Sequence, residues 1–267
     1  MNAPASEPLL LSALENGVLR LTLNRPAARN ALSSALMLAL LDGLEHAAAD
    51  PAVRVIVIAA NGPVFSAGHD LRELTATRAD RDHGKEAFAA LFTQCSKLMQ
   101  AIVAHPRPVI AEIQGVATAA GCQLVASCDL AVAADTAKFA TPGVNIGLFC
   151  STPMVALSRN VPRKVAMEML LTGDMVTAQD AVKIGLINRA VAPENVRAEV
   201  MALAAKIAAK PYATIRTGKH AFYEQAEMTL ADAYAYAAQV MTENMLHAES
   251  REGIGAFLEK REPQWPT

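Results

Sequence analysis

The spacing of apolar residues changes repeatedly between two periods along the chain, and this change predicts a mixed α/β fold. Val18–Leu23 alternates apolar residues with Arg20 and Thr22, which indicates a strand buried on one face. Residues 54–60 and 109–114 are short apolar runs of strand length, and residues 33–50 between the first two have helical spacing. A strand–helix–strand order favours parallel pairing.

The rest of the chain continues this order and then becomes wholly helical. Thr177 to Asp180 resembles a capping box, and Gly173 suits the left-handed end of the helix before it. Further strands are expected at residues 129–133, 138–140 and 187–191, and further helices at 85–105, 163–171, 177–184, 195–209, 212–225, 230–244 and 247–260.

A composition change near Pro211 suggests how the chain is divided. We expect a tail and first strand region over residues 1–17, with residues 1–8 loose, then a core over 18–210 and a helical region over 211–267. Residues 72–84 are charged and show no clear period, so we expect a mobile surface segment there.

Two glycine-containing turns follow buried strands, and they are the strongest chemical signal in the chain. Residues 65–71 read Phe-Ser-Ala-Gly-His-Asp-Leu, and residues 114–124 read Gln-Gly-Val-Ala-Thr-Ala-Ala-Gly-Cys-Gln-Leu. Gly68 permits a tight turn, and residues 115–120 are expected to lead from a strand into a helix, where backbone N–H groups are free. Each turn can direct one N–H at the same carbonyl oxygen, which would polarise a thioester and stabilise an enolate.

These turns, together with Phe-Ala-Thr-Pro-Gly-Val-Asn-Ile-Gly at residues 139–147, resemble the enoyl-CoA hydratase/isomerase (crotonase) superfamily. The resemblance extends from about Val18 to Trp265. It implies a ClpP/crotonase-like spiral of ββα units with a C-terminal helical layer that forms homotrimers, often paired into hexamers. It also implies an acyl-CoA substrate, with coenzyme A as part of the substrate and no separate cofactor.

The resemblance assigns roles to individual residues. The N–H groups of His69 and Ala120 would form the oxyanion hole, and Gly121 would keep the site open. The imidazole of His69 is expected to point to solvent, and its use as a base is the alternative. Further contacts with coenzyme A are expected from Arg25, Arg29, Ala67, Gly68, Asp70 and Leu71, and more weakly from Lys260 and Arg261.

The chain departs from the active hydratases of this family at both acid–base positions. Gln123 and Gly143 stand where those enzymes have glutamates, and neither side chain can transfer a proton near neutral pH. General acid–base catalysis typically contributes ~10²–10⁴ in rate. We therefore expect weak hydratase activity at an otherwise intact acyl-CoA site.

Three alternatives remain open at this stage. The space at Gly143 could hold bicarbonate as an external base, or Cys150 or Ser151 could act as nucleophile or base, although a lone cysteine is more often a small buried hydrophobe. The chain could also be a non-catalytic acyl-CoA-binding protein or catalyse another thioester reaction, such as hydrolysis.

Composition excludes several other classes of function. The net charge of −2 provides no broad basic surface for nucleic acid, and the four cysteines show no zinc spacing, so no metal site is expected. We see no signal peptide and no apolar run of membrane-spanning length, and we expect a cytoplasmic protein.

Overall fold

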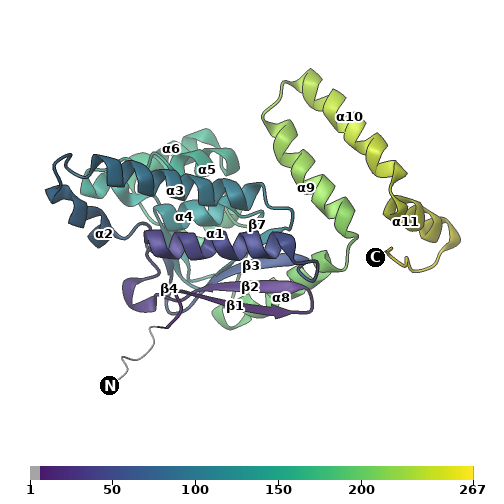
Figure 1. Cartoon of the computed structure of the whole chain (residues 1–267), viewed down its shortest axis with the longest axis horizontal. Coiled ribbons are helices and arrows are strands. Elements are labelled where there is room, and N and C mark those ends of the chain that lie inside the picture. Colours follow the sequence, from purple (N-terminus) through teal and green to yellow (C-terminus); the bar gives the residue numbers. More distant parts are fainter. Residues whose placement is uncertain (1–6, 267) are drawn as a thin grey trace.

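Two β-sheets form the centre of the computed structural model, which describes residues 7–266 (Figure 1). The larger sheet has the order β1-β2-β3-β5-β7-β10, in which β1 is antiparallel to β2 and the other neighbours are parallel. The smaller sheet has the order β4-β6-β8-β9. The strands are β1 Leu10–Glu15, β2 Val18–Leu23, β3 Val55–Ala60, β4 Val64–Ser66, β5 Val109–Ile113, β6 Val116–Thr118, β7 Leu130–Ala134, β8 Lys138–Ala140, β9 Val176–Thr177 and β10 Arg189–Val191.

Helices lie between many of the strands along the chain and also form its C-terminal part. The α-helices are α1 Ser34–Ala49, α2 Leu71–Ala76, α3 Lys85–Val103, α4 Ala120–Ser127, α5 Pro153–Asn160, α6 Arg163–Thr172, α7 Ala178–Lys183, α8 Val196–Ala208, α9 Tyr212–Ala226, α10 Leu230–Leu246 and α11 Ala248–Glu259. Short 3₁₀ helices occur at Pro26–Ala28, Thr77–Ala79, Pro142–Ile146 and Pro193–Asn195. The pairs β3–β4, β5–β6 and β7–β8 each contribute one strand to each sheet, which is the repeating unit of the crotonase fold.

Several local predictions are confirmed. Ser33 caps α1 by accepting from the Leu36 N–H, Thr177 caps α7 in the same way, and Gly173 ends α6 with φ of 68°. The predicted parallel pairing is present between β2 and β3. The predicted loose segment over residues 1–8 lies mainly outside the described part of the chain.

The prediction that β2 is buried on only one face is wrong. Five of its six residues are buried, and the remaining residue, Arg20, forms a bidentate pair with the buried Glu112 of β5 at 2.7 and 3.1 Å. Arg20 also donates to Thr22. A charged position within β2 is therefore satisfied across the sheet instead of by solvent.

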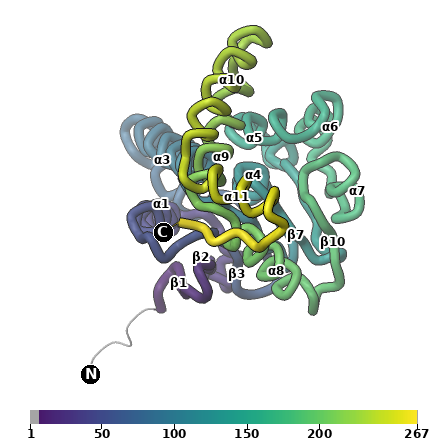
Figure 2. Tube along the Cα trace, turned by 90° about the vertical axis from the view of Figure 1, so that its right-hand side faces the viewer, coloured from purple at the N-terminus to yellow at the C-terminus, as the bar shows by residue number. Residues whose placement is uncertain are grey.

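The C-terminal helices α9, α10 and α11 lie to one side of the sheets (Figures 1 and 2). A partly buried ion pair joins α9 to the start of β7, with Lys219 Nζ 2.7 Å from Asp129 Oδ2. Tyr223 also donates to Asp129, at 2.9 Å. Neither α9 nor α10 contains a buried residue, which is consistent with a division of the chain near residue 211. That division remains a proposal.

Candidate functional site

The first predicted turn leads from β4 to α2, and its backbone is fixed on both sides of His69. The Gly68 carbonyl accepts from the Leu32 N–H at 2.7 Å, and the Ala67 N–H donates to the Arg29 carbonyl at 3.1 Å. Gly68 has φ of +93°, a conformation that favours glycine. Among the described residues, no acceptor pairs with the His69 N–H, so this donor is available to a ligand.

The second turn contains β6, a short strand absent from our prediction, and α4 then begins at Ala120. Ala119 has φ of 51°, and its N–H donates to the Ala140 carbonyl at 2.9 Å. Because Ala120 is the first residue of the helix, its N–H has no partner within α4. This arrangement leaves a second free donor at the positive end of a helix.

The two turns pack directly against each other. A Cβ atom at Gly68 would lie 2.8 Å from Ala119 Cβ and 3.3 Å from the Ala120 nitrogen. A Cβ atom at Gly121 would lie 2.3 Å from the Ser66 carbonyl oxygen. We call this contact between residues 65–71 and 115–121 the junction; it exists because glycine occupies both contact positions.

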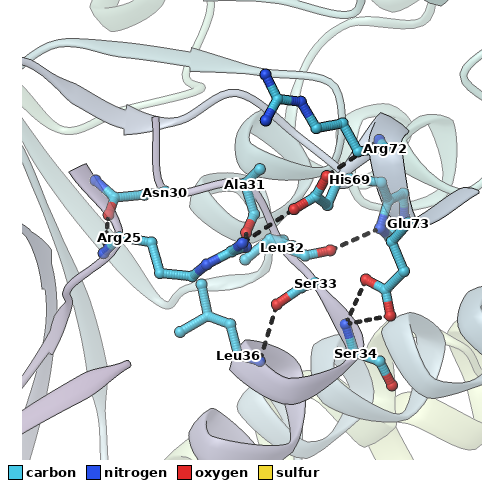
Figure 3. Close-up of polar contacts among 11 residues, drawn as sticks. Arg25, Asn30, Ala31, Leu32, Ser33, Ser34, Leu36, His69, Arg72 and Glu73 are labelled. Carbon is cyan, nitrogen blue, oxygen red and sulfur yellow. Dashed lines mark hydrogen bonds and ion pairs between the residues drawn. The ribbon is translucent and has the colours of Figure 1, made fainter. Parts of the chain in front are cut away.

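Arg25, one of the residues predicted to contact coenzyme A, forms an ion pair beside the junction (Figure 3). Arg25 Nη2 lies 3.0 Å from Asp70 Oδ2, and Arg25 Nη1 donates to the Ala31 carbonyl. Burial alone would raise the pKa of Asp70, but hydrogen bonds from Arg25 and from backbone N–H groups lower it below its ordinary value. Arg29 is instead exposed, so its charge is the more accessible of the two.

The prediction that the imidazole of His69 points to solvent is wrong. Its Nδ1 lies 3.4 Å from the Leu32 carbonyl (Figure 3). Its ring meets Phe92 of α3 edge to face, with 5.5 Å between the ring centroids. The Nε2 atom is buried and has no hydrogen-bond partner. Burial lowers the pKa of His69, so the ring is neutral at neutral pH.

Gln123 is buried on α4 and contacts α3. Its Oε1 lies 3.8 Å from Cys95 Sγ, which acts as a weak donor. Burial raises the pKa of the Cys95 thiol to about 11, so this group stays protonated. Phe92 and Cys95 are three residues apart and share one face of α3, and neither was predicted to lie at the site. Their helical spacing was visible, but the packing partner of that face was not.

The space expected beside Gly143 is filled. A Cβ atom there would lie 2.4 Å from the Leu148 carbonyl oxygen and 2.8 Å from Cys150 Sγ. The Gly143 N–H already donates to that sulfur at 3.3 Å. These atoms occupy the region that the first side-chain atom of a glutamate would enter, so no open space adjoins Gly143 in that direction, and we derive no step through a bicarbonate ion.

The alternatives at Cys150 and Ser151 gain no support from their surroundings. Burial raises the pKa of the Cys150 thiol, which opposes the thiolate needed for attack. Ser151 is exposed, and its hydroxyl donates to the Phe149 carbonyl. All four cysteines are free and buried.

Two surface hollows lie away from the junction. One of about 350 Å³ lies between α9 and the start of β7, beside Lys219 and Tyr223. The other, of about 430 Å³, lies along α6 and α7. Neither hollow is lined by His69, Ala120 or Gln123.

A family model described as enoyl-CoA hydratase/isomerase matches residues 13–267. The chain belongs to this family. It is 49% identical to the Xenopus laevis enoyl-CoA hydratase domain-containing protein 3, mitochondrial, covering 97% of this chain and 86% of that protein. It is 35% identical to the Escherichia coli 2,3-dehydroadipyl-CoA hydratase, covering 96% of this chain and 98% of that protein.

Solved structures of family members agree with the fold. The enoyl-CoA hydratase of Mycobacterium smegmatis has a TM-score of 0.93 at 52% identity, covering 98% of this chain and all of that one. Human enoyl Coenzyme A hydratase domain-containing protein 3 has a TM-score of 0.92 at 47% identity, covering 97% and 100% of the two chains.

The prediction of a cytoplasmic protein is contradicted by the same comparisons. The Xenopus laevis relative and its Homo sapiens counterpart, which is 48% identical, are both named as mitochondrial proteins. The features of the first residues that suggested a cytoplasmic location were therefore a poor guide. Within residues 7–266, none of the helices combines the length and apolar character that crossing a membrane requires.

Proposed function

We propose that this family member binds acyl-CoA thioesters at the junction and polarises the thioester carbonyl with the N–H groups of His69 and Ala120. Two donors directed at one oxygen stabilise the negative charge that develops there when an enolate forms. Removing one such donor typically costs ~10²–10³ in rate.

The close contact of the two turns supports this proposal most directly. A Cβ atom at Gly68 would lie only 3.3 Å from the Ala120 nitrogen, and His69 follows Gly68 in the chain. The two unpaired N–H groups therefore belong to backbone segments in van der Waals contact. Buried backbone donors are otherwise almost always paired, so two free ones in contacting segments favour a ligand site.

We further propose that hydration of enoyl-CoA substrates is slow. The side chain of Gln123 cannot exchange a proton, and Gly143 has no side chain and no room for one. Loss of general acid–base catalysis is expected to reduce hydration by ~10²–10⁴ relative to a site with both glutamates. Non-catalytic acyl-CoA binding, or another reaction of the thioester such as hydrolysis, is the competing proposal.

The position of the first turn also suggests which residues contact coenzyme A. The side chains of Arg29 and Leu71 are exposed at the edge of the first turn, where a phosphate and an apolar part of the ligand would meet them. Arg25 and Asp70 are already paired, so we assign them to holding the turn in place. Ala67 and Gly68 add little side-chain volume at this edge, so the ligand can approach the backbone closely.

We propose that the C-terminal helices form a homo-oligomeric interface, a trimer or a dimer of trimers. Large apolar side chains are exposed on α10 and α11, among them Leu230 at 76%, Leu246 at 74% and Phe257 at 82%. Exposed apolar surface of this extent is typical of a subunit interface. Light scattering should give three or six times the mass of 28.2 kDa, and a monomer would contradict the proposal.

Calorimetry with two ligands tests carbonyl binding without altering the protein. Acetyl-CoA has the thioester oxygen, and S-ethyl-CoA lacks it but has a similar shape. Two net hydrogen bonds of about 1 kcal/mol each predict ~10–30-fold tighter binding of acetyl-CoA. Equal affinities would show that the oxygen is not recognised, and crotonyl-CoA hydration measured in parallel would separate slow turnover from none.

A further inference from the structure

The Nε2 atom of His69 is the polar atom near the junction that most needs explanation. It is buried and has no hydrogen-bond partner, whereas buried polar side-chain atoms in folded proteins are nearly always paired. The residue that provides one N–H of the junction thus also carries an unpaired, buried ring nitrogen.

The surroundings of the ring determine which nitrogen bears the proton. Nδ1 faces the Leu32 carbonyl at 3.4 Å, and a carbonyl can only accept, so Nδ1 is the protonated nitrogen. Nε2 consequently has a free lone pair. Burial lowers the pKa of the ring, while Glu73 of α2 acts in the opposite direction. From α3 the ring meets the uncharged Phe92.

The other groups near the junction are either already paired or bear no free acceptor for a proton. The Asp70 carboxylate is paired with Arg25, and the Glu73 carboxylate accepts from the Ser34 N–H at 3.0 and 3.3 Å. The Cys95 thiol remains protonated, and Gln123 is an amide.

One face of α3 contacts both the His69 ring and Gln123, the residue at the position of the missing glutamate. Phe92 contacts His69, and Cys95, one turn later on the same face, contacts Gln123. The imidazole and the Gln123 amide therefore lie along one wall. In active hydratases that wall would include a carboxylate at position 123.

We propose that His69 Nε2 is the base that removes a proton from the α-carbon of an acyl-CoA bound at the junction, which rests on the proposed function. The C–H bond breaks, its electron pair enters the enolate held by the two N–H groups, and the proton forms a new N–H bond at Nε2. Return of a proton from the imidazolium regenerates the thioester, so no co-reactant is needed.

Because Nε2 is buried, the proposed step requires α2, which begins two residues after His69, to move when the acyl group binds. α2 has six residues, none of which is buried. The contacts of Asp70 and Glu73 with neighbouring groups hold it in place.

Exchange of α-protons in deuterated water tests the proposal. Acetyl-CoA is incubated with the protein, and loss of the methyl proton signal is followed by NMR. We expect His69→Gln, which keeps the backbone N–H, to slow exchange by ~10²–10⁴ while changing acetyl-CoA affinity less than about 3-fold. His46→Gln, at a histidine on α1 remote from the junction, is the matched control and should exchange at the wild-type rate.

Two further readouts separate a catalytic from a structural role. The wild-type rate should fall with decreasing pH as the ring is protonated, and this dependence should disappear in His69→Gln. Free imidazole should restore exchange in His69→Ala.

Wild-type exchange in His69→Gln would overturn the inference. So would a wild-type protein that binds acetyl-CoA in preference to S-ethyl-CoA but exchanges no protons. Absence of that binding preference would instead overturn the proposed function.

Discussion

Gly121→Ala should separate the two turns and remove thioester recognition. The added Cβ atom would lie 2.3 Å from the Ser66 carbonyl oxygen, 2.8 Å from Ser66 Cβ and 2.9 Å from the Ser66 carbonyl carbon. Real Cβ contacts essentially never fall below 3.0 Å, so the turns must part by roughly 0.7 Å or more. The obstacle is backbone, which cannot rotate away as a long side chain could.

This displacement is large on the scale of catalytic geometry. A misplacement of about 1 Å can cost ~10² in rate, and overpacking typically destabilises by about 1–3 kcal/mol. We therefore expect Gly121→Ala to bind acetyl-CoA no more tightly than S-ethyl-CoA and to lose ~10²-fold in α-proton exchange. Titration calorimetry and urea unfolding measure the two effects separately.

Gly218→Ala on α9 is the matched control, because its Cβ would meet no atom within 4 Å. It should keep the preference for acetyl-CoA and be as stable as the wild type or about 0.5–1 kcal/mol more so. If Gly121→Ala kept both the wild-type preference for acetyl-CoA and the wild-type stability, the contact of the turns would not form the site.

Three further outcomes follow from the structure. Gly143→Glu should destabilise by about 1–3 kcal/mol without raising crotonyl-CoA hydration, because Leu148 and Cys150 fill the space; a gain in hydration would contradict this. Lys219→Met removes the charged partner of the largely enclosed Asp129, which keeps the hydrogen bond from Tyr223, and should cost about 1–3 kcal/mol in urea unfolding. Lys183→Met, in an exposed pair, should cost less than about 1 kcal/mol; equal costs would refute the distinction. Burial lowers the pKa of His105, so folding favours the neutral imidazole. The contribution of His105 to the free energy of unfolding is therefore full above pH 6.5 and should decline as the pH falls below that value. His105→Gln should reduce this loss of stability at low pH, and an unchanged loss would assign it to other groups.

The two turns could be predicted from the sequence because their signal is local. A buried strand, a run of small residues and a glycine occur in order within a few positions. The cap at Thr177 and the left-handed Gly173 were predictable for the same reason.

The state of Gly143 could not be predicted, because it depends on a later loop. The sequence shows that the side chain is missing, which suggests a space. Only the folded chain shows that the Leu148 carbonyl and the Cys150 thiol occupy that space. The bicarbonate hypothesis was consistent with the sequence, and the packing around Gly143 gives it no support.

The helix α2 had a local sequence signal, whereas the orientation of the His69 ring had none. We expected a mobile surface segment over residues 72–84, but α2 extends into it, and Asp70 caps α2 by accepting from the Arg72 N–H. The acidic residue Glu73, three positions after this cap, resembles a capping box and was a usable local signal. The inward orientation of the imidazole had no such signal, because it depends on Phe92 of a separate helix.

Difference infrared spectroscopy of bound acetyl-CoA, labelled with ¹³C at the thioester carbonyl, tests the central claim most directly. Two N–H groups on one oxygen should weaken the C=O bond, so the account predicts a carbonyl band at lower frequency in the complex than in water. Gly121→Ala should return that band to its position in water. A carbonyl frequency that does not change when acetyl-CoA binds to the wild-type protein would contradict the account.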